Sequence, residues 1–455
     1  MPIRAINPAT GETVADYSTM SPADTFAAVT EAHEAWPRWR TTTFGDRARL
    51  FRSMAEHLRQ RKDELARLMA VEMGKPLAQG RAEVDKCAWV SEYYADHAET
   101  HLAHDVIPTD ATRSYVAFEP LGVVLAVMPW NFPLWQVYRF AAPALMAGNV
   151  GVLKHASNVP GCALVIEELF QQAGFPHGVF RTLLVGSDQV RAIIEHPLVR
   201  AVTLTGSTPA GKAVAAQAGA VLKKTVLELG GSDPYLILED ADVDQAAAVC
   251  VAARLVNSGQ SCVAAKRFIA VDAVRDAFTE RFIALMRTKK TGDPLDPDTD
   301  VGPQARHDLR DELHGQVVAS VAKGAALRLG GSIPEGPGAF YPPTVLTNVT
   351  AGMPAHDEEL FGPVAAIIAA RDEADAIRIA NGTIFGLGAA VFSRDLERGE
   401  RVARQLEAGC TFVNSQVASD PRLPFGGIKE SGYGRELGVY GIREFVNTKT
   451  VVIRP

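Results

Sequence analysis

Residues 201–231 read "AVTLTGSTPAGKAVAAQAGAVLKKTVLELGG" and contain the pattern that decides the fold. Two short apolar runs, "AVTLT" and "TVLEL", flank a segment of helix length. Ser207, Thr208 and Pro209 follow the first run with the residue types of a helix N-cap and first turn. Short apolar runs that alternate with helix-length segments predict βαβ units and a parallel sheet buried on both faces.

The same alternation continues on both sides of this stretch. The runs "VVLAVM", "VGVLK" and "VFRTLL" precede it, and a second series after residue 234 consists of "YLILE", "RFIAV", "VAAIIAA", "GAAVFS" and "CTFVN". Two series indicate two α/β domains, as the length of 455 residues also suggests. Residues 22–100 read as helical, because charges of both signs are interleaved around apolar positions.

Two further segments read as strands that belong to neither series. Residues 104–120, "HDVIPTDATRSYVAFEP", alternate partially and predict a hairpin that leaves the body of its domain. The final segment "EFVNTKTVVIRP" reads as a strand that needs a partner. An exposed apolar edge is a liability, so we expect a subunit interface there.

Composition narrows the function classes. The net charge is −7 and no basic cluster stands out, so we expect neither nucleic acid nor a membrane as a partner. The five cysteines are scattered, without disulfide or metal-ligand spacing, which predicts a reducing compartment and no metal site. The N-terminal sequence lacks the layout of a signal or transit peptide, and we expect a cytoplasmic protein.

Cys262 lies in "LVNSGQSCVAAKR", residues 255–267, directly after a predicted helix. Asn257, Ser258 and Gly259 are residue types that end helices, so the thiol of Cys262 is expected at a helix exit, where it can reach a cleft. Cys250 lies inside the preceding alanine- and valine-rich helix and is expected to be a buried apolar residue.

Three other segments carry groups that would complete a covalent mechanism. Asn131, in the proline-flanked loop "MPWNFP", could donate to an oxyanion, or it could serve only turn geometry. Glu228 ends an apolar strand and could accept a proton near neutral pH, or it could pair with a cation. The helix that begins at Ser207 could bind a phosphate, although the full G-x-G-x-x-G pattern is missing.

Six motifs, in order, resemble those of the aldehyde dehydrogenase superfamily: "PWNFP", "TGSTPAG", "LELGG", "GQSC", "EELFGPV" and "PFGGIKESGYGRE". The resemblance implies an α/β fold with a Rossmann-like cofactor domain, an α/β catalytic domain and a small β oligomerisation element. The implied boundaries are 1–101 and 120–229 for the dinucleotide-binding domain, 230–430 for the catalytic domain, and 102–119 and 431–455 for the oligomerisation element. A homodimer or homotetramer is expected.

The resemblance also assigns roles to residues. Cys262 matches the nucleophile, Asn131 the oxyanion donor and Glu228 the base that activates water. The cofactor-binding positions are Trp130, Lys154, Ser157, Gly206, Ser207, Glu359 and Phe361. NAD-selective members often carry a glutamate where this chain has Ser157, so we expect NADP or NAD, with NADP accepted. Ser157 could also simply cap the following helix.

The aldehyde is suggested by Arg139, a lone cation on an otherwise apolar helix. Arginine pairs bidentately with carboxylates, so Arg139 could bind an acidic substrate, or it could form an internal ion pair. Trp135 and Ser419 are expected to shape the aldehyde entrance. These segments resemble the succinate-semialdehyde dehydrogenase branch, which implies succinic semialdehyde, with glutarate semialdehyde or aliphatic aldehydes as alternatives.

Three rival functions stay open at this point. A cysteine esterase would use Cys262 without a nicotinamide, but no histidine stands in a comparable motif. A non-catalytic structural or binding protein on the same fold would not need Cys262, Glu228 and Asn131 together. A third rival would end with transfer to coenzyme A, whereas Glu228 as a water activator favours hydrolysis.

Overall fold

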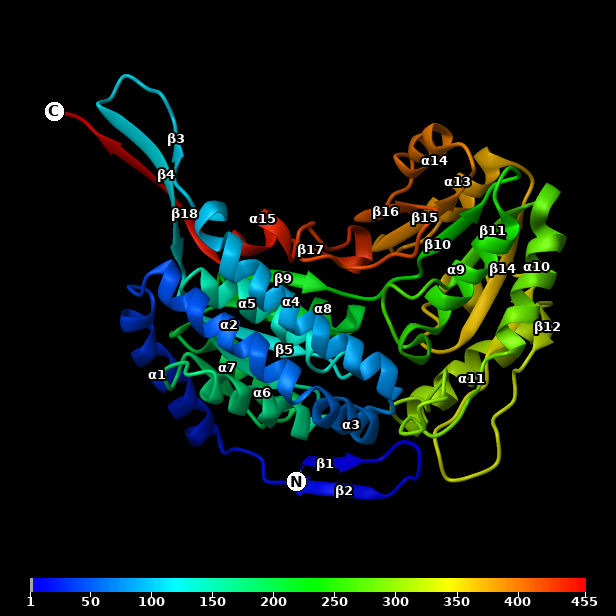
Figure 1. Ribbon diagram of the computed structural model, residues 1–455, viewed down its shortest axis with the longest axis horizontal. Coiled ribbons are helices and arrows are strands. Elements are labelled where there is room, and N and C mark those ends of the chain that lie inside the picture. The colour runs from blue at the N-terminus through cyan, green and yellow to red at the C-terminus, as the bar shows by residue number, and fades with distance from the viewer. Residues whose placement is uncertain (1–2) are drawn as a thin grey trace.

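The computed structural model describes residues 3–455 and contains two large sheets and two small ones (Figure 1). The six-stranded sheet has the order β17-β9-β8-β5-β6-β7, and the seven-stranded sheet has the order β12-β13-β14-β11-β10-β15-β16. Each large sheet has its own helices, and the two units lie next to each other in Figure 1. The predicted α/β class with two sheets is confirmed.

The stretch that opened the sequence analysis forms a strand, a helix and a parallel strand. In the six-stranded sheet, β5 (Val123–Met128), β6 (Val150–His155), β7 (Phe180–Thr182), β8 (Val199–Thr205) and β9 (Lys224–Glu228) are parallel. The connecting segments form α5 (Trp135–Met146), α6 (Pro160–Gln172), the 3-10 turn η1 (Ser187–Gln189), α7 (Val190–Glu195) and α8 (Thr208–Ala220). All five strands coincide with the apolar runs of the first series.

The predicted helical region before these strands is also confirmed. It consists of α1 (Pro22–Trp39), α2 (Phe44–Gln60), α3 (Lys62–Met73) and α4 (Leu77–His101). Ser21 and Thr43 begin α1 and α2 with capping boxes, in which an aspartate three residues later bonds back to the cap. The hairpin of β1 (Ile3–Ile6) and β2 (Thr13–Tyr17), which the sequence did not predict, precedes them.

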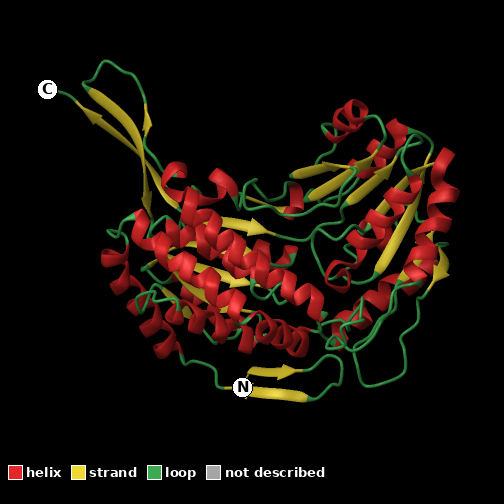
Figure 2. Cartoon of the chain, in the orientation of Figure 1, coloured by secondary structure: helices red, strands yellow, loops and turns green. Residues whose placement is uncertain are grey.

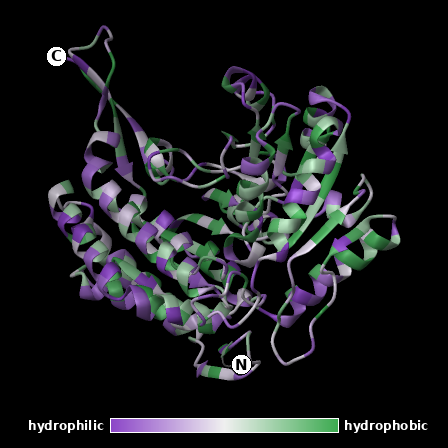
Figure 3. Ribbon diagram, turned by 45° about the vertical axis from the view of Figure 1, so that its right-hand side comes forward, coloured by the Kyte–Doolittle hydropathy of each residue, from purple (hydrophilic) through white to green (hydrophobic). Residues whose placement is uncertain are grey.

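Five strands of the seven-stranded sheet coincide with the runs of the second series, and the other two were not predicted. Its parallel strands are β10 (Pro234–Ile237), β11 (Arg267–Val271), β13 (Thr344–Thr347), β14 (Val364–Ala370), β15 (Gly388–Phe392) and β16 (Cys410–Val413), with β12 (Ala326–Leu329) antiparallel at one edge. Its helices are α9 (Val243–Leu255), α10 (Asp272–Arg287), α11 (His307–Ala322), α12 (Pro354–Asp357), α13 (Glu373–Asn381) and α14 (Leu396–Ala403). Helices and strands alternate clearly in Figure 2, and the strands of this sheet are largely apolar in Figure 3.

The fourth sheet extends away from the body at the upper left of Figure 1. It joins the hairpin of β3 (Asp105–Val106) and β4 (Arg113–Pro120) to the last strand, β18 (Val446–Ile453), in the order β18-β4-β3. The last strand therefore finds its partner within the chain, because β18 pairs with β4 along its whole length.

The segment before the last strand returns to the six-stranded sheet. It contains the 3-10 turn η3 (Lys429–Ser431), β17 (Gly432–Tyr433) and α15 (Gly438–Ile442), and β17 pairs with β9. The domain boundaries given above stay a prediction. Within residues 3–455, none of the helices combines the length and apolarity that a membrane crossing requires.

Gly259 ends the 3-10 turn η2 (Val256–Gly259) with φ of +79°, and a Cβ there would lie 2.3 Å from the carbonyl carbon of Gly362. We expect Gly259→Ala to destabilise the protein by about 2–4 kcal/mol, because it adds both backbone strain and a backbone clash. A thermal melt should show a lower Tm.

Gly315→Ala is the matched control, since a Cβ at this position in α11 meets nothing within 4 Å. This variant should keep the Tm or raise it, because alanine in a helix adds up to about 1 kcal/mol to the free energy of unfolding relative to glycine. An unchanged Tm for Gly259→Ala would contradict the stated role of the glycine.

Candidate active site

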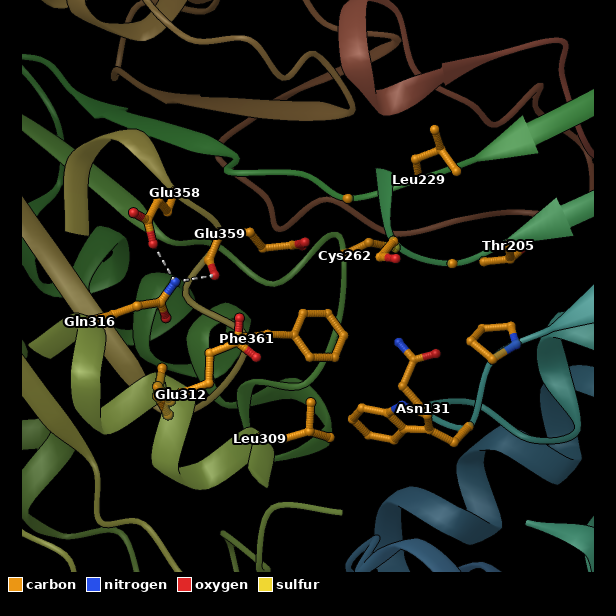
Figure 4. A pocket seen from close by; sticks show the side chains of 16 residues that line it. Asn131, Thr205, Leu229, Cys262, Leu309, Glu312, Gln316, Glu358, Glu359 and Phe361 are labelled. Carbon is orange, nitrogen blue, oxygen red and sulfur yellow. Dashed lines mark hydrogen bonds between the residues drawn. The ribbon is translucent and has the colours of Figure 1, made fainter. Parts of the chain in front are cut away.

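A cavity of about 380 Å³ lies between the two large sheets (Figure 4). One wall comes from the carboxyl ends of β5, β8 and β9, and the other from the turn after η2, from α11 and from the loop before β14. Ligands of open α/β sheets bind at the carboxyl ends of strands, so the cavity is where the fold predicts a ligand. Its lining residues are Pro129, Trp130, Asn131, Thr205, Gly206, Ser207, Leu229, Gly230, Cys262, Leu309, Glu312, Leu313, Gln316, Glu358, Glu359 and Phe361.

Seven of the residues predicted for the site line this cavity. They are Trp130, Asn131, Gly206, Ser207, Cys262, Glu359 and Phe361. Glu228 is the residue before the lining Leu229 and is buried at the end of β9. The other predicted residues, Arg139, Trp135, Lys154, Ser157 and Ser419, are not among the lining residues.

The turn that carries Cys262 is shaped by left-handed residues at the end of α9. Asn257 and Ser258 have φ of 53° and 56°, which confirms the predicted helix end. The Asn257 amide donates to the carbonyl oxygen of Asn131 at 2.6 Å and to that of Gln260 at 3.0 Å. The Asn131 amide donates to the Gln260 carbonyl oxygen at 3.1 Å.

These bonds hold the loop of Asn131 against the turn of Cys262. A side-chain amide carries two N–H groups, so the Asn131 amide retains one for a ligand oxygen. In Figure 4, Asn131, Cys262 and Phe361 face the same space.

Lys266 supports the nucleophile turn from behind and was missed by the sequence analysis. Its ammonium is fully buried and donates to the carbonyl oxygens of Ser261, Cys262 and Ala264 at 3.0, 2.8 and 3.1 Å. It also lies 3.3 Å from a carboxylate oxygen of Glu359. A lysine four residues after the cysteine, at the start of a buried strand, was the available signal.

The electrostatics of the cavity keep the thiol protonated in this state. Burial raises the pKa of Cys262 to about 12, although Arg139 and Lys266 act in the opposite direction. Burial also raises the pKa of Glu228 well above its usual value, with a further increase from Glu436 and an opposing effect of Arg139. Both Glu228 oxygens lack a hydrogen-bond partner in the part of the chain that the structure describes, so the alternative of a direct cation pair is not observed.

Arg139 forms the internal ion pair that the sequence analysis had kept as an alternative. It lies on α5, where it pairs with Glu436, and both side chains are nearly inaccessible. One guanidinium nitrogen also donates to the hydroxyl of Thr205 at 3.3 Å, and the group lies 4.8 Å from the ring centre of Phe425. Glu436 is almost 300 residues away in sequence, which is why no local pattern indicated it.

Lys154 lies near the end of the neighbouring strand β6, Ser157 lies just after it, and neither lines the main cavity. Burial lowers the pKa of Lys154, and Asp188 partly offsets this. Ser157 lines a separate cavity of about 550 Å³ together with residues of the N-terminal hairpin. His155 lies between them, and its ring nitrogen bonds the Pro133 carbonyl oxygen at 2.8 Å, which ties this segment to the loop of Asn131.

Several features fit a bound nicotinamide dinucleotide. The side chain of Ser207 makes no capping bond to α8, so the first-turn N–H groups are left for an anion such as a phosphate. Phe361 and Trp130 meet edge to face, with ring centres 5.7 Å apart, at the cavity wall. A Cβ at Gly230 would lie 2.5 Å from a Glu359 oxygen, so the glycine makes room for that carboxylate.

A parallel sheet whose carboxyl ends share one cavity with a cysteine, an amide and carboxylates is the architecture of a dinucleotide-dependent dehydrogenase with a cysteine nucleophile. The family model described as "Aldehyde dehydrogenase family" matches residues 1–451. The chain therefore belongs to the aldehyde dehydrogenase family, and it is an enzyme of that family.

Relatives and solved structures agree with this assignment. The chain is 52% identical over 459 residues to a succinate-semialdehyde dehydrogenase [NADP(+)] of Mycolicibacterium paratuberculosis, covering 100% of this chain and 97% of the relative. It is 50% identical over 456 residues to succinate-semialdehyde dehydrogenase [NADP(+)] 1 of Mycobacterium tuberculosis, covering 100% of both. The crystal structure of succinic semialdehyde dehydrogenase from Streptococcus pyogenes, in complex with NADP+, superposes with a TM-score of 0.97 at 39% identity, covering 100% of both chains.

We expect the Cys262 thiol of the nucleotide-free enzyme to react slowly with iodoacetamide at pH 7. Because the pKa lies near 12, the thiolate fraction and the alkylation rate should rise about tenfold per pH unit from pH 7 to 10. Mass spectrometry of the peptide that contains Cys262 measures the rate, with the buried Cys250 as an internal reference. A plateau between pH 7 and 8 would show that the resting thiol is already ionised.

Proposed function

We propose that the enzyme oxidises succinic semialdehyde to succinate with NADP, or with NAD, as the acceptor. The observation that carries the proposal is the shared cavity of Cys262 and Asn131 with Glu228 buried beside it. The chain is also about half identical, along its whole length, to relatives named as NADP-dependent succinate-semialdehyde dehydrogenases. The domain division and the residue roles below are part of this proposal.

In the first half of the reaction, the Cys262 thiol gives up its proton to solvent and the sulfur adds to the aldehyde carbon, which forms a thiohemiacetal oxyanion. The free N–H of the Asn131 amide and the backbone N–H of Cys262 stabilise the oxyanion, and each such donor typically lowers the barrier by about 3 kcal/mol. A bound nicotinamide would accept the hydride that leaves the aldehyde carbon, and the acyl group would stay on Cys262 as a thioester. Glu359, held by the Gly231 N–H at 3.0 Å and by Lys266, would bind its ribose.

In the second half, the thioester on Cys262 is hydrolysed. Glu228 accepts a proton from water, and its raised pKa strengthens it as a base once its own proton has left. Arg139 lies close enough to favour the charged forms of both Glu228 and Cys262, while its pairing with Glu436 limits this effect. One buried ion pair would thus tune both reacting groups.

Replacing each reacting group should stop the reaction at a different point. Cys262→Ala should abolish aldehyde oxidation while NADP binding, measured by calorimetry, persists. Glu228→Gln should release about one NADPH per subunit and then slow by a factor of roughly 10²–10⁴, because the thioester is not hydrolysed. Stopped-flow absorbance of the reduced nicotinamide measures both effects.

The same assay separates the rival functions. A cysteine esterase would act without any absorbance change of the nicotinamide. An enzyme that transfers the acyl group to coenzyme A would need added coenzyme A for turnover. Retained aldehyde oxidation by Cys262→Ala would refute the proposed mechanism.

NADP use is proposed to depend on the absence of a carboxylate at residue 157. Ser157→Glu should reduce kcat/KM for NADP at least about tenfold and that for NAD much less, because like charges repel the 2′-phosphate. Ser157→Gln is the matched neutral control and should keep NADP use. If both variants kept the NADP/NAD ratio of the wild type, residue 157 would have no role in cofactor choice.

We further propose a homodimer or homotetramer and a cytoplasmic location. The free edge of β18 in the three-stranded sheet supports the first of these, because an unpaired edge favours association with another copy.

A further inference from the structure

Lys86 of α4 lies between the two residues predicted to shape the aldehyde entrance. Its ammonium donates to the hydroxyl of Ser419 at 2.8 Å and lies 4.4 Å from the ring centre of Trp135. The sequence analysis did not single out Lys86, because a lysine on a helix rich in charged residues gives no local signal. The structure thus places a cation against the two residues predicted to shape the entrance, where a hydroxyl and an aromatic face contact it.

The two cations near this entrance differ in whether they are already paired. Arg139 is engaged by Glu436 and Thr205. Lys86, in contrast, forms no ion pair with any carboxylate of residues 3–455, and Ser419 provides its hydrogen-bond acceptor there. An ammonium has three N–H donors, and Ser419 accepts from one of them, so Lys86 has donors left for an anionic ligand.

Lys86 and the reacting thiol share an electrostatic environment. Trp135 and Arg139 lie one turn apart on the same face of α5, which packs against α4. Arg139 donates to the hydroxyl of Thr205, which lines the same cavity as Cys262. Asn131 precedes the same helix by four residues.

We propose that the Lys86 ammonium, with the Ser419 hydroxyl beside it, binds the carboxylate of an ω-carboxy aldehyde and so selects this substrate over neutral aldehydes. The inference rests on the proposed function and names a substrate-binding residue for it. Arg139 then acts on the reacting groups through its field, while Lys86 supplies the unpaired charge.

The ionisation of Lys86 gives this selection a pH dependence. Burial lowers the pKa of Lys86 to about 8, with a further decrease from Arg139 on α5. Three groups raise the pKa of Lys86 instead: Cys87 and Glu83 on α4, and Asp420, the residue after Ser419. The ammonium is present below this pKa and is lost above it, so selection of the carboxylate should weaken as the pH rises past 8.

The test compares kcat/KM for succinic semialdehyde and for butanal. Lys86→Met should lower the value for succinic semialdehyde about 10–100-fold and leave that for butanal within about threefold, because only the former loses a charged partner. Lys62→Met is the control: the partly exposed Lys62 of α3 pairs with Asp85, the residue before Lys86 on α4, and its loss should affect neither substrate. Butanal oxidation and a thermal melt report whether each variant is folded.

A pH series provides a second measurement that does not need the methionine variant. The ratio of the two kcat/KM values should fall between pH 7.5 and 9.5 in the wild type and stay high in Lys86→Arg, since arginine remains charged. Taking the ratio cancels the ionisation of Cys262 and Glu228, which affects both substrates.

Each outcome decides between the two proposals. A wild-type enzyme without preference for succinic semialdehyde would overturn the proposed substrate and the role of Lys86 together. The role of Lys86 alone would be overturned if Lys86→Met kept the wild-type preference, including the case in which both kcat/KM values fall by the same factor. It would also be overturned if the wild-type ratio of the two values stayed constant from pH 7.5 to 9.5.

Discussion

The active-site cavity depends on one buried ammonium group, that of Lys266. A charge removed from water is costly unless it is fully paired, and Lys266 is paired by three backbone carbonyl oxygens and by the Glu359 carboxylate. The carbonyl oxygens belong to the turn that presents Cys262, and Glu359 belongs to the loop before β14 in the same wall of the cavity. Because the same cation binds both, a displacement of either segment would expose an unpaired charge. The position of Cys262 relative to the Glu359 carboxylate is therefore set by desolvation as well as by packing.

A second buried ion pair, Arg139 with Glu436, acts on the chemistry without facing the cavity. Glu228 has no hydrogen-bond partner within the described residues, and its neutral form is favoured by burial and by the nearby Glu436. The guanidinium of Arg139 opposes this and also favours the thiolate of Cys262. A substrate carboxylate bound directly to Arg139 would have to compete with Glu436. The ion pair thus accounts for an arginine on an apolar helix. If the proposed substrate is correct, its carboxylate would be bound by another cation.

Local patterns in the sequence were enough to predict the elements that carry the site, because strand, turn and helix-end signals are set by neighbouring residues. The alternation around residues 201–231 and the helix-ending Asn257 to Gly259 are such signals. They correctly placed Glu228 at the end of a strand and Cys262 just after the end of a helix. The hairpin β1–β2 and the strands β12 and β13 were missed, since they are short, and β12 is largely exposed. Glu436, Lys266 and Lys86 were missed for a different reason: their roles arise from contacts between segments distant in sequence. Ser157 lines a separate cavity, and its expected role at the cofactor stays a prediction.

The reacting groups come from two sheets with separate cores, so their relative position cannot be fixed by either core alone. Asn131 follows a strand of the six-stranded sheet, whereas Asn257 and Gln260 follow a helix of the seven-stranded one. Asn257 and Ser258 adopt left-handed conformations, each of which costs roughly 1 kcal/mol or more for a residue other than glycine. The Asn257 amide offsets this cost by bonding two carbonyl oxygens, one on each side of the junction. Glycine at residue 257 would relieve the strain but would remove both bonds. The strained asparagine thus keeps the Asn131 loop and the Cys262 turn in contact across the boundary between the two sheets.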